Sequence, residues 1–306
     1  MKVVVFGSNG LVGSSIMRTL GSNKIVSELI GSRRKETNLF SLDDTKKLIH
    51  TIKPNIIINA AAKVGGILAN NSYRSDFIFE NLKINMNILE SIIEFPDIKV
   101  INLGSSCIYP LGAKNPISEE SLMTGKLEPT NSPYAMAKLT AIELGDALNK
   151  QYGHEVLNIM PTNLYGPNDN FDINNGHVLP SLIAKFHGSL EKSKHWVVKL
   201  WGDGSPKREF LHVDDLAEAC YTCMQKYDDV EHINVGTGED VTIKELAETI
   251  VDVVGYKNDY EWDTSKPNGT PRKVLNVDKI KSLGWEPKIG LREGIESTYE
   301  WYKNNL

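Results

Sequence analysis

Tyr134 and Lys138 stand four positions apart in the segment Tyr134-Ala135-Met136-Ala137-Lys138. In a helix this spacing puts a phenol and an ammonium group on the same face. The nearby positive charge favours the phenolate and lowers the pKa of the tyrosine, so the phenol could donate or accept a proton near neutral pH. Many helices contain such a pair by chance, and the pair alone leaves a structural role open.

A polar turn, Gly104-Ser105-Ser106-Cys107, directly follows a predicted strand at residues 100–103. Ligands of open α/β sheets bind beyond the carboxyl ends of the strands, so the Ser105 hydroxyl could hydrogen-bond a substrate oxygen beside Tyr134. Cys107 in the same turn is, on its residue type alone, most often a small buried apolar residue. The order of glycine turn, strand-end serine and Tyr-x-x-x-Lys is far more specific than any one of these pieces.

Glycines near the N-terminus predict a phosphate-binding turn between a strand and a helix. Residues 3–6 are a short apolar run rich in β-branched side chains, and apolar residues recur near helical spacing over 11–20. Between them Gly7 permits a tight turn, Gly10 lets backbone approach a diphosphate, and Gly13 lets the helix pack on the strand. Free N–H groups at the helix start favour an anion. A ligand-free glycine turn is the alternative, because this spacing alone is a weak signal.

The end of the second predicted strand indicates which dinucleotide binds. An enzyme that uses NAD usually has Asp or Glu there, and the carboxylate binds the ribose hydroxyls. Here the segment Leu29-Ile30-Gly31-Ser32-Arg33-Arg34 has no acid and two arginines. Guanidinium groups suit a 2′-phosphate, so we expect NADP(H), with Arg33 as the first candidate and Arg34 as the second. A solvated pair of loop charges is the alternative.

The alternation of strands and helices predicts an α/β fold of the Rossmann type, a doubly wound parallel sheet. We expect strands at 3–6, 25–30, 56–60, 100–103 and 156–159, and helices at 11–20, 42–51, 76–95 and 133–152. After residue 167 the rhythm breaks. Helices are expected at 178–188, 214–226, 242–254 and 291–305, and strands at 197–201 and 210–213. We therefore expect residues 1–168, with segments near 209–236 returning to them, to form an NADP-binding domain. Residues 169–306 should form mainly a smaller, interleaved C-terminal lobe that binds substrate.

The helix predicted at 133–152 has apolar side chains on two sides. Ala135, Leu139 and Ile142 form one stripe, and Leu144 and Leu148 belong to another on roughly the opposite side. A helix with two apolar faces is buried on both. One face should meet the sheet, and the other should meet either a second subunit, which would make a homodimer, or the C-terminal lobe.

Composition and charge exclude several classes of protein. The chain has 306 residues and a formal net charge of −5, which argues against a general nucleic-acid binder. Its three cysteines form no disulfide framework, so we expect a reducing cytoplasm. Cys220 and Cys223 have no second Cys/His pair at zinc spacing, so we expect a buried structural pair and no metal site. No signal peptide is visible and no apolar stretch nears the ~20 residues that span a bilayer, so no membrane contact is expected.

Segments spread along almost the whole chain resemble those of the extended short-chain dehydrogenase/reductase family. They are AAAKVGGILANN (60–71), LGSSCIYP (103–110), EPTNSPYAMAK (128–138), MPTNLYGPNDNF (160–171), HVLPSLIAKFH (177–187), WGDGSPKREFLHVDD (201–215), INVGTGEDVTI (233–243) and KPNGTPRK (266–273). Within this family they are similar to the members that act on GDP-linked keto-sugars. The resemblance implies an NADPH-dependent enzyme with GDP-4-keto-6-deoxy-D-mannose as substrate. Such an enzyme inverts the two carbons that flank the ketone, carbons 3 and 5, and then reduces the ketone at carbon 4.

The resemblance also implies a role for each catalytic candidate. Epimerisation needs a base on one side of the sugar and an acid on the other, and the resemblance assigns these to Cys107 and His177. An ordinary exposed or capping histidine is the alternative for His177. Ser105 should hold the ketone oxygen, Tyr134 should polarise and protonate it, and Lys138 should bind the nicotinamide ribose and tune Tyr134. The same site could hold an enolate oxygen during epimerisation.

Cofactor and substrate contacts are implied in the same way. The residues expected at NADP(H) are Gly7, Ser8, Asn9, Gly10, Leu11, Val12, Gly13, Arg33, Arg34, Leu103, Gly104, Lys138, Pro161, Thr162, Asn163, Leu164 and His177. The residues expected at the nucleotide sugar are Lys185, Trp201, Arg208, Asn268 and Lys273. Lys185 stands where the family often has Arg, so its contact with the diphosphate would lack the bidentate fork. Asn268 replaces an Asp of relatives, which changes the corresponding hydrogen bond.

Two other functions remain to be weighed. One is a nucleotide-sugar epimerase or 4,6-dehydratase that retains NAD. Dehydratases of this family have an Asp-Glu pair where Ser106-Cys107 stands here, and they need that acid and base to eliminate water. The other is a non-catalytic dinucleotide-binding protein, a sensor or scaffold. Such relatives usually lose the tyrosine or the lysine, and this chain has both Tyr134 and Lys138.

Overall fold

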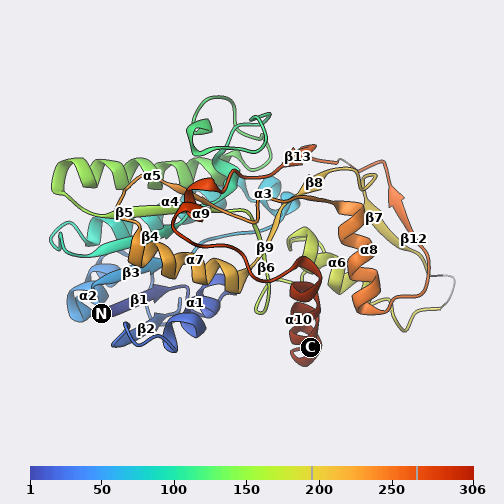
Figure 1. Cartoon of the computed structure of the whole chain (residues 1–306), viewed down its shortest axis with the longest axis horizontal. Helices are drawn as coiled ribbons and strands as arrows, with labels where there is room; N and C mark the ends of the chain where they lie inside the picture. Colours follow the sequence, from blue (N-terminus) through green and yellow to red (C-terminus); the bar gives the residue numbers. More distant parts are fainter. Residues whose placement is uncertain (194–195, 267) are drawn as a thin grey trace.

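A six-stranded parallel sheet lies at the centre of the computed structural model, which describes residues 1–193, 196–266 and 268–306 (Figure 1). Its order is β10-β5-β4-β3-β1-β2. The strands are β1 (Lys2–Phe6), β2 (Glu28–Ser32), β3 (Ile56–Asn59), β4 (Lys99–Leu103), β5 (Val156–Pro161) and β10 (Ile233–Val235). Strands β3 and β5 are buried along their whole length, as expected for a parallel sheet that is covered on both faces. The predicted doubly wound Rossmann-type fold is confirmed.

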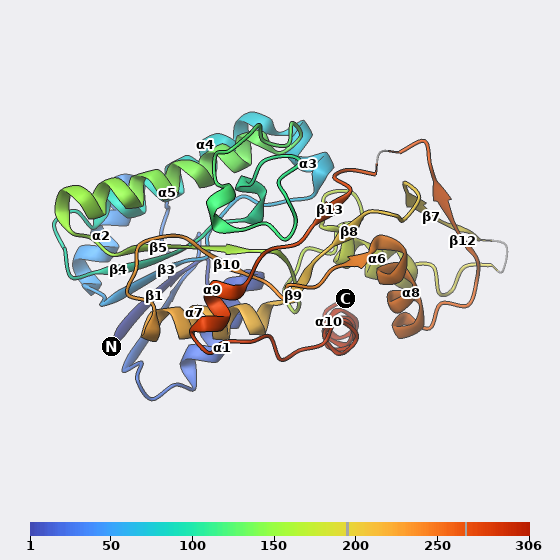
Figure 2. The ribbon, with the colours of Figure 1, turned by 45° about the horizontal axis from the view of Figure 1, so that its top comes forward.

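Helices cover both faces of this sheet (Figure 2). Helices α2 (Leu42–Ile52), α4 (Arg74–Ser91) and α5 (Ser132–Tyr152) contribute to one apolar core with the sheet. Helices α1 (Leu11–Gly21) and α7 (Val213–Lys226) contribute to the core on the other face. Cys220 and Cys223 lie on α7 inside this second core, where burial raises the pKa of both thiols.

Helix α4 covers the second apolar stripe of α5. Leu144 and Leu148 of α5 belong to the same apolar cluster as Ile84 and Ile88 of α4. Both of the covers left open for this stripe, a second subunit and the C-terminal lobe, are therefore replaced by α4. The neighbouring helix of the same sheet layer buries it, because α4 and α5 follow adjacent strands β3 and β4 and lie side by side.

Two predicted boundaries shift for local reasons. The strand expected at 25–30 is β2 at Glu28–Ser32, because the Asn23 side chain accepts from the N–H of Ile25 and its carbonyl accepts from Val26, which folds this stretch into a turn. The helix expected to reach residue 95 ends at Ser91, where tighter turns replace the helical pattern ahead of Pro96.

A second lobe is built from shorter pieces, on the right in Figure 1. Its helices include α6 (Val178–His187), α8 (Ile243–Val254) and α10 (Leu291–Asn304). Strand β7 (Val198–Trp201) pairs with β12 (Tyr260–Asp263). A three-stranded sheet has the order β11 (Val241–Thr242), β8 (Lys207–Arg208), β13 (Arg272–Lys273). Leu182, Phe186, Leu246, Ile250 and Ile295 form the centre of its apolar core.

Several short elements connect or flank the two parts. They are α3 (Ile67–Ser72), α9 (Asp278–Ser282), the 3₁₀ turns η1 (Ser106–Ile108) and η2 (Glu119–Ser121), and the strand pair β6 (Asn163–Tyr165) and β9 (Phe210–His212). The strand predicted at 210–213, as part of a segment that returns to the first domain, corresponds to β9. It pairs with β6, and the later strand β10 joins the six-stranded sheet.

Glu209 lies where chain segments from both parts cross. Its side chain is fully buried and accepts hydrogen bonds from the backbone N–H of Gly238 at 2.7 Å and of Leu275 at 2.9 Å. Its backbone carbonyl accepts from the side chains of Thr162 and Asn163, just after β5. Burial raises the pKa of this carboxyl group, and the N–H donors partly oppose the rise.

Within the described ranges, no helix combines the length and the apolar character that crossing a membrane requires.

Candidate active site

The glycine turn forms a cradle at the carboxyl end of β1. Gly7 has φ +75°, and a Cβ there would lie 2.8 Å from the backbone nitrogen of Ala61. A Cβ at Gly13 would lie 2.0 Å from the carbonyl oxygen of Gly7, so only glycine lets α1 pack this closely on the turn. Helix α1 begins at Leu11 with exposed Gly10 as its N-cap. The N–H groups of its first turn have no partner within the helix, which fits the diphosphate of a dinucleotide.

The other cofactor candidates gather at the same edge of the sheet. Leu103 ends β4 and Pro161 ends β5, and Gly104 and residues 162–164 follow directly. The side chains of Thr162 and Asn163 both donate to the Glu209 carbonyl. The N–H of Thr162 also donates to the carbonyl of Val235, so these side chains and this N–H are engaged within the fold.

Arg33 and Arg34 have different surroundings at the end of β2. The Arg33 guanidinium is paired with Glu36, its Nε atom lying 2.8 Å from the carboxylate, and this partner raises the pKa of Arg33. The Arg34 guanidinium lies 4.9 Å from the centre of the Phe40 ring. Among the described residues Arg34 has no acidic partner within ion-pair distance.

Tyr134 and Lys138 project from the first turns of α5 toward the end of β4. Lys138 is buried, its Nζ atom donates to the carbonyl of Leu103 at 2.6 Å, and burial lowers its pKa to about 8. It lies 5.8 Å from the centre of the Tyr134 ring. The expectation that this lysine lowers the pKa of Tyr134 is wrong here. Burial raises the pKa of the phenol, a thiolate at Cys107 raises it further, and hydrogen bonding to Ser105 partly opposes both.

Cys107 is half-buried in the η1 turn beside these groups. Its N–H donates to the Ser105 hydroxyl at 3.2 Å, and the Asn131 side-chain amide donates to its sulfur at 3.5 Å. Arg208 is also near: burial lowers the pKa of Arg208, and the charge of a Cys107 thiolate works against that shift. The thiol thus has an amide donor and a guanidinium close to it.

His177 occupies the N-cap position of α6. Its ring is solvent-accessible at the surface, yet desolvation by the surrounding protein lowers its pKa from 6.5. The loop before it is tied to the cofactor edge, because Asn168 donates to the Ser14 hydroxyl of α1 and Asn175 accepts from the N–H of Gly66. Among the described residues its imidazole makes no hydrogen bond with Cys107 or Tyr134. The structure brings Ser105, Cys107, Tyr134, Lys138 and Arg208 together and does not join His177 to them by a contact.

The nucleotide-sugar candidates lie on the second lobe. Arg208 and Lys273 stand in register on neighbouring strands β8 and β13. Lys185 of α6 is half-buried, and desolvation lowers its pKa. Trp201 ends β7 with its ring exposed and the Lys266 ammonium 5.8 Å from the ring centre.

Asn268 has a structural task in addition to its predicted one. Its side-chain oxygen accepts from the N–H of Asp203 at 3.0 Å and lies against Gly202. The Asn268 side chain is thus partly engaged with Asp203 inside its own lobe, through a bond that its amide oxygen accepts.

Sequence reasoning missed Asn131 and the residues that hold it. Asn131 was contained in the segment 128–138 but was assigned no role. The available signal was its place directly before a helix with Pro133 in the first turn, which marks an N-cap residue.

Comparisons with known proteins match this geometry. The sequence model of the NAD dependent epimerase/dehydratase family matches residues 3–236. GDP-L-fucose synthase 1 of Arabidopsis thaliana is 48% identical over 305 residues, which cover 100% of this chain and 94% of that protein. GDP-L-fucose synthase of Escherichia coli K12 is 46% identical over 313 residues, covering 99% of this chain and 97% of that protein. The crystal structure of a GDP-L-fucose synthetase from Naegleria fowleri bound to NADP has a TM-score of 0.90 and 28% identity, covering 99% of this chain and 94% of that one.

Proposed function

This chain belongs to the NAD dependent epimerase/dehydratase family, and we propose that it is an NADPH-dependent 3,5-epimerase and 4-reductase that converts GDP-4-keto-6-deoxy-D-mannose into GDP-L-fucose. The observation that carries the proposal is the place of Cys107. Its thiol lies beside the Ser105, Tyr134 and Lys138 group of a reductase, with the Asn131 amide and the charge of Arg208 next to it. A simple reductase needs no thiolate there, whereas an epimerase needs a base.

In the epimerisation, the Cys107 thiolate removes a proton from a carbon next to the ketone. The C–H electron pair forms the carbon–carbon double bond of the enolate, and the π electrons of the C=O bond move onto the ketone oxygen. Ser105 and Tyr134 hold this oxygen through their hydroxyl groups, which stabilises the developing negative charge. His177 returns a proton to the opposite face of the same carbon, which inverts it. Cys107 then loses its proton to solvent and His177 regains one from solvent, and the same steps at the second flanking carbon complete the epimerisation.

In the reduction, NADPH supplies the hydride when bound. Tyr134 donates the proton to the ketone oxygen, and its raised pKa keeps the phenol protonated at neutral pH, in the form that can donate. Lys138, which donates to the Leu103 carbonyl, would also hydrogen-bond the nicotinamide ribose. Ser105 keeps the oxygen oriented throughout.

The cofactor candidates fit NADPH, with Arg34 now preferred over Arg33 for the 2′-phosphate. Arg33 is engaged by Glu36 within its own loop, so a phosphate would have to compete with a carboxylate for it. Arg34 rests on the apolar face of Phe40 and can present its guanidinium to a phosphate. Arg208, Lys273 and Lys185 provide positive charge for the diphosphate of the sugar nucleotide.

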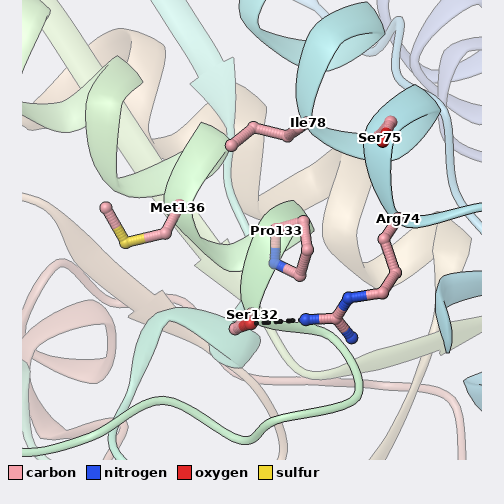
Figure 3. A pocket seen from close by; sticks show the side chains of 6 residues that line it. All are labelled: Arg74, Ser75, Ile78, Ser132, Pro133 and Met136. Carbon is pink, nitrogen blue, oxygen red and sulfur yellow. Dashed lines mark hydrogen bonds between the residues drawn. The ribbon is translucent and has the colours of Figure 1, made fainter.

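We also propose a homodimer through the outer faces of α4 and α5. Phe79, Met86 and Met136 are exposed at 63%, 46% and 45% on these helices. Figure 3 shows a pocket between the two helix starts, where Ile78, Pro133 and Met136 provide apolar surface. A second copy of this chain would cover this surface. Light scattering should give the mass of a dimer, and Met86→Glu should shift it toward the 34.1 kDa monomer.

The free cysteines support a cytoplasmic location. Cys220 and Cys223 lie one helical turn apart on α7, are buried, and are not joined to each other or to Cys107. Three unpaired thiols suit a reducing compartment.

The test is an assay with GDP-4-keto-6-deoxy-D-mannose in deuterium oxide, with NADPH and NADH compared. We expect loss of the reduced-nicotinamide absorbance with NADPH, deuterium at both carbons that flank the reduced centre, and GDP-L-fucose as product. Cys220→Ser, a buried cysteine away from the site, serves as the matched control for Cys107→Ser. Unchanged absorbance with this substrate would contradict the proposal.

A further inference from the structure

Asn131 stands between Cys107 and the helix that carries Tyr134. It is the N-cap residue of α5, and its side-chain nitrogen lies 3.5 Å from the Cys107 sulfur. The oxygen of the same amide is buried and has no hydrogen-bond partner among the described residues. A buried acceptor without a partner costs stability, so the fold keeps this amide here at a cost.

The loop that carries Asn131 is fixed from one side by Glu128. The Glu128 carboxylate accepts from the backbone N–H of Thr130 at 3.0 Å and of Asn131 at 3.1 Å, and from the Thr130 hydroxyl. These bonds define the direction in which the Asn131 side chain leaves the backbone.

Arg74 of α4 fixes the loop from the other side. Its guanidinium donates to the carbonyls of Pro129 at 2.8 Å and Thr130 at 3.2 Å. It also donates to the Ser132 hydroxyl, the contact drawn in Figure 3. Two charged side chains from different segments thus hold a short loop whose inward-facing polar group is the Asn131 amide.

The placement of the Asn131 amide matters for the chemistry of the neighbouring Cys107 sulfur. An N–H donor stabilises a thiolate more than a thiol, because the anion is the stronger acceptor. The Arg208 guanidinium also lies near the thiol, but it is a candidate for the substrate diphosphate, which would share its charge during turnover. The Asn131 amide is uncharged and remains with the sulfur.

We propose that Asn131 is a positioning residue that holds the Cys107 thiolate toward the sugar. Its amide oxygen also accepts a hydrogen bond from a hydroxyl group of that sugar. This rests on the proposed function, in which Cys107 is the base. A polyhydroxylated substrate satisfies the buried oxygen that the protein leaves without a partner.

Alkylation of Cys107 by iodoacetamide over a range of pH tests the thiolate part without any substrate. Cys220 and Cys223 are buried, so the native protein reacts at Cys107. Asn131→Ser keeps a good N-cap but withdraws the amide from the sulfur, and Asn131→Asp keeps the shape but puts a negative charge there. We expect the alkylation midpoint to rise by about one pH unit in N131S, roughly a 10-fold slower reaction at neutral pH, and further in N131D. Asn149→Ser, the same exchange at the far end of α5, where the amide donates to the carbonyl of His154, should leave it unchanged.

Turnover tests the second part. In N131S we expect deuterium incorporation beside the ketone to slow about 10-fold and the KM for the keto-sugar to rise, with NADPH affinity unchanged. An alkylation midpoint that is the same in wild type, N131S and N131D would overturn the proposal. Failure of the proposed function looks different: Cys107→Ser would then leave deuterium exchange intact, whatever the midpoints.

Discussion

The Nζ atom of Lys138 lies 2.6 Å from the carbonyl oxygen of Leu103, the last residue of β4. This hydrogen bond ties the helix that carries Tyr134 to the strand that leads into Ser105 and Cys107. It holds a buried ammonium group at the cofactor edge, where burial lowers its pKa to about 8.

Replacement of Lys138 by Met should change how stability depends on pH. The folded protein disfavours the charged lysine, so from about pH 8 to 10.5 the unfolded chain binds more protons and the wild type gains stability as pH rises. The gain relative to Lys138→Met should be at most of order 3 kcal/mol over this window. Urea unfolding of both proteins at pH 7.5 and 10.5 measures it. A stability difference that stays constant over these pH values would show that Lys138 is not held in a desolvated site.

Tyr134→Phe should remove the proton donor of the reduction while preserving the ring. We expect the rate of NADPH oxidation to fall by about 10²–10⁴-fold and the deuterium exchange to fall less, because Ser105 still holds the enolate oxygen. Stopped-flow absorbance and mass spectrometry separate the two rates. Tyr152→Phe, at the exposed end of the same helix, is the control. Equal loss in both tyrosine variants would count against a catalytic phenol.

His177→Asn should alter the pH profile of epimerisation. Desolvation lowers the pKa of His177 from 6.5, so the alkaline limb of kcat/KM for deuterium incorporation, where His177 loses the proton that it donates, should lie below pH 6.5 in the wild type. The variant should lose that limb together with most of the activity. His187→Asn, on the last turn of the same helix, should keep the wild-type profile. Persistence of the limb in H177N would assign it to another group.

Arg34→Ala should weaken binding of NADPH more than binding of NADH. Loss of a guanidinium fork on the 2′-phosphate should raise the KM for NADPH by about 10-fold or more, with little change for NADH. Arg33→Ala should have a smaller effect, because Glu36 already occupies that group, and Glu36→Gln should lower the KM for NADPH by freeing it. Steady-state kinetics with both cofactors provides the comparison. A larger effect from R33A than from R34A would restore Arg33 as the first candidate.

The sequence was informative where local chemistry determines local structure. Gly7 and Gly13 stand where a side chain would collide with backbone, and the β-branched runs became the buried strands. Such features depend on residues close together in the chain, so spacing and residue type were enough to predict the order of strands and helices.

Features that depend on long-range packing could not be predicted. The rule that a lysine four positions away lowers the pKa of a tyrosine assumes a solvated helix, whereas burial of Tyr134 and the nearby Cys107 reverse the direction. Pairing of Arg33 with Glu36 depends on how the loop after β2 turns back on itself. The place of Asn131 depends on Arg74 and Glu128, which reach it from a different helix and from the far end of its own loop.

The buried carboxylate of Glu209 depends for its hydrogen bonds on residues that come much later in the chain. Its N–H donors come from Gly238 and Leu275, which are synthesised long after the strands of the first sheet. A nascent or proteolysed chain that ends before residue 238 would have an internal negative charge with neither donor. A chain truncated before Gly238 should therefore be less stable than the full chain, because it lacks both of the hydrogen bonds that this carboxylate accepts.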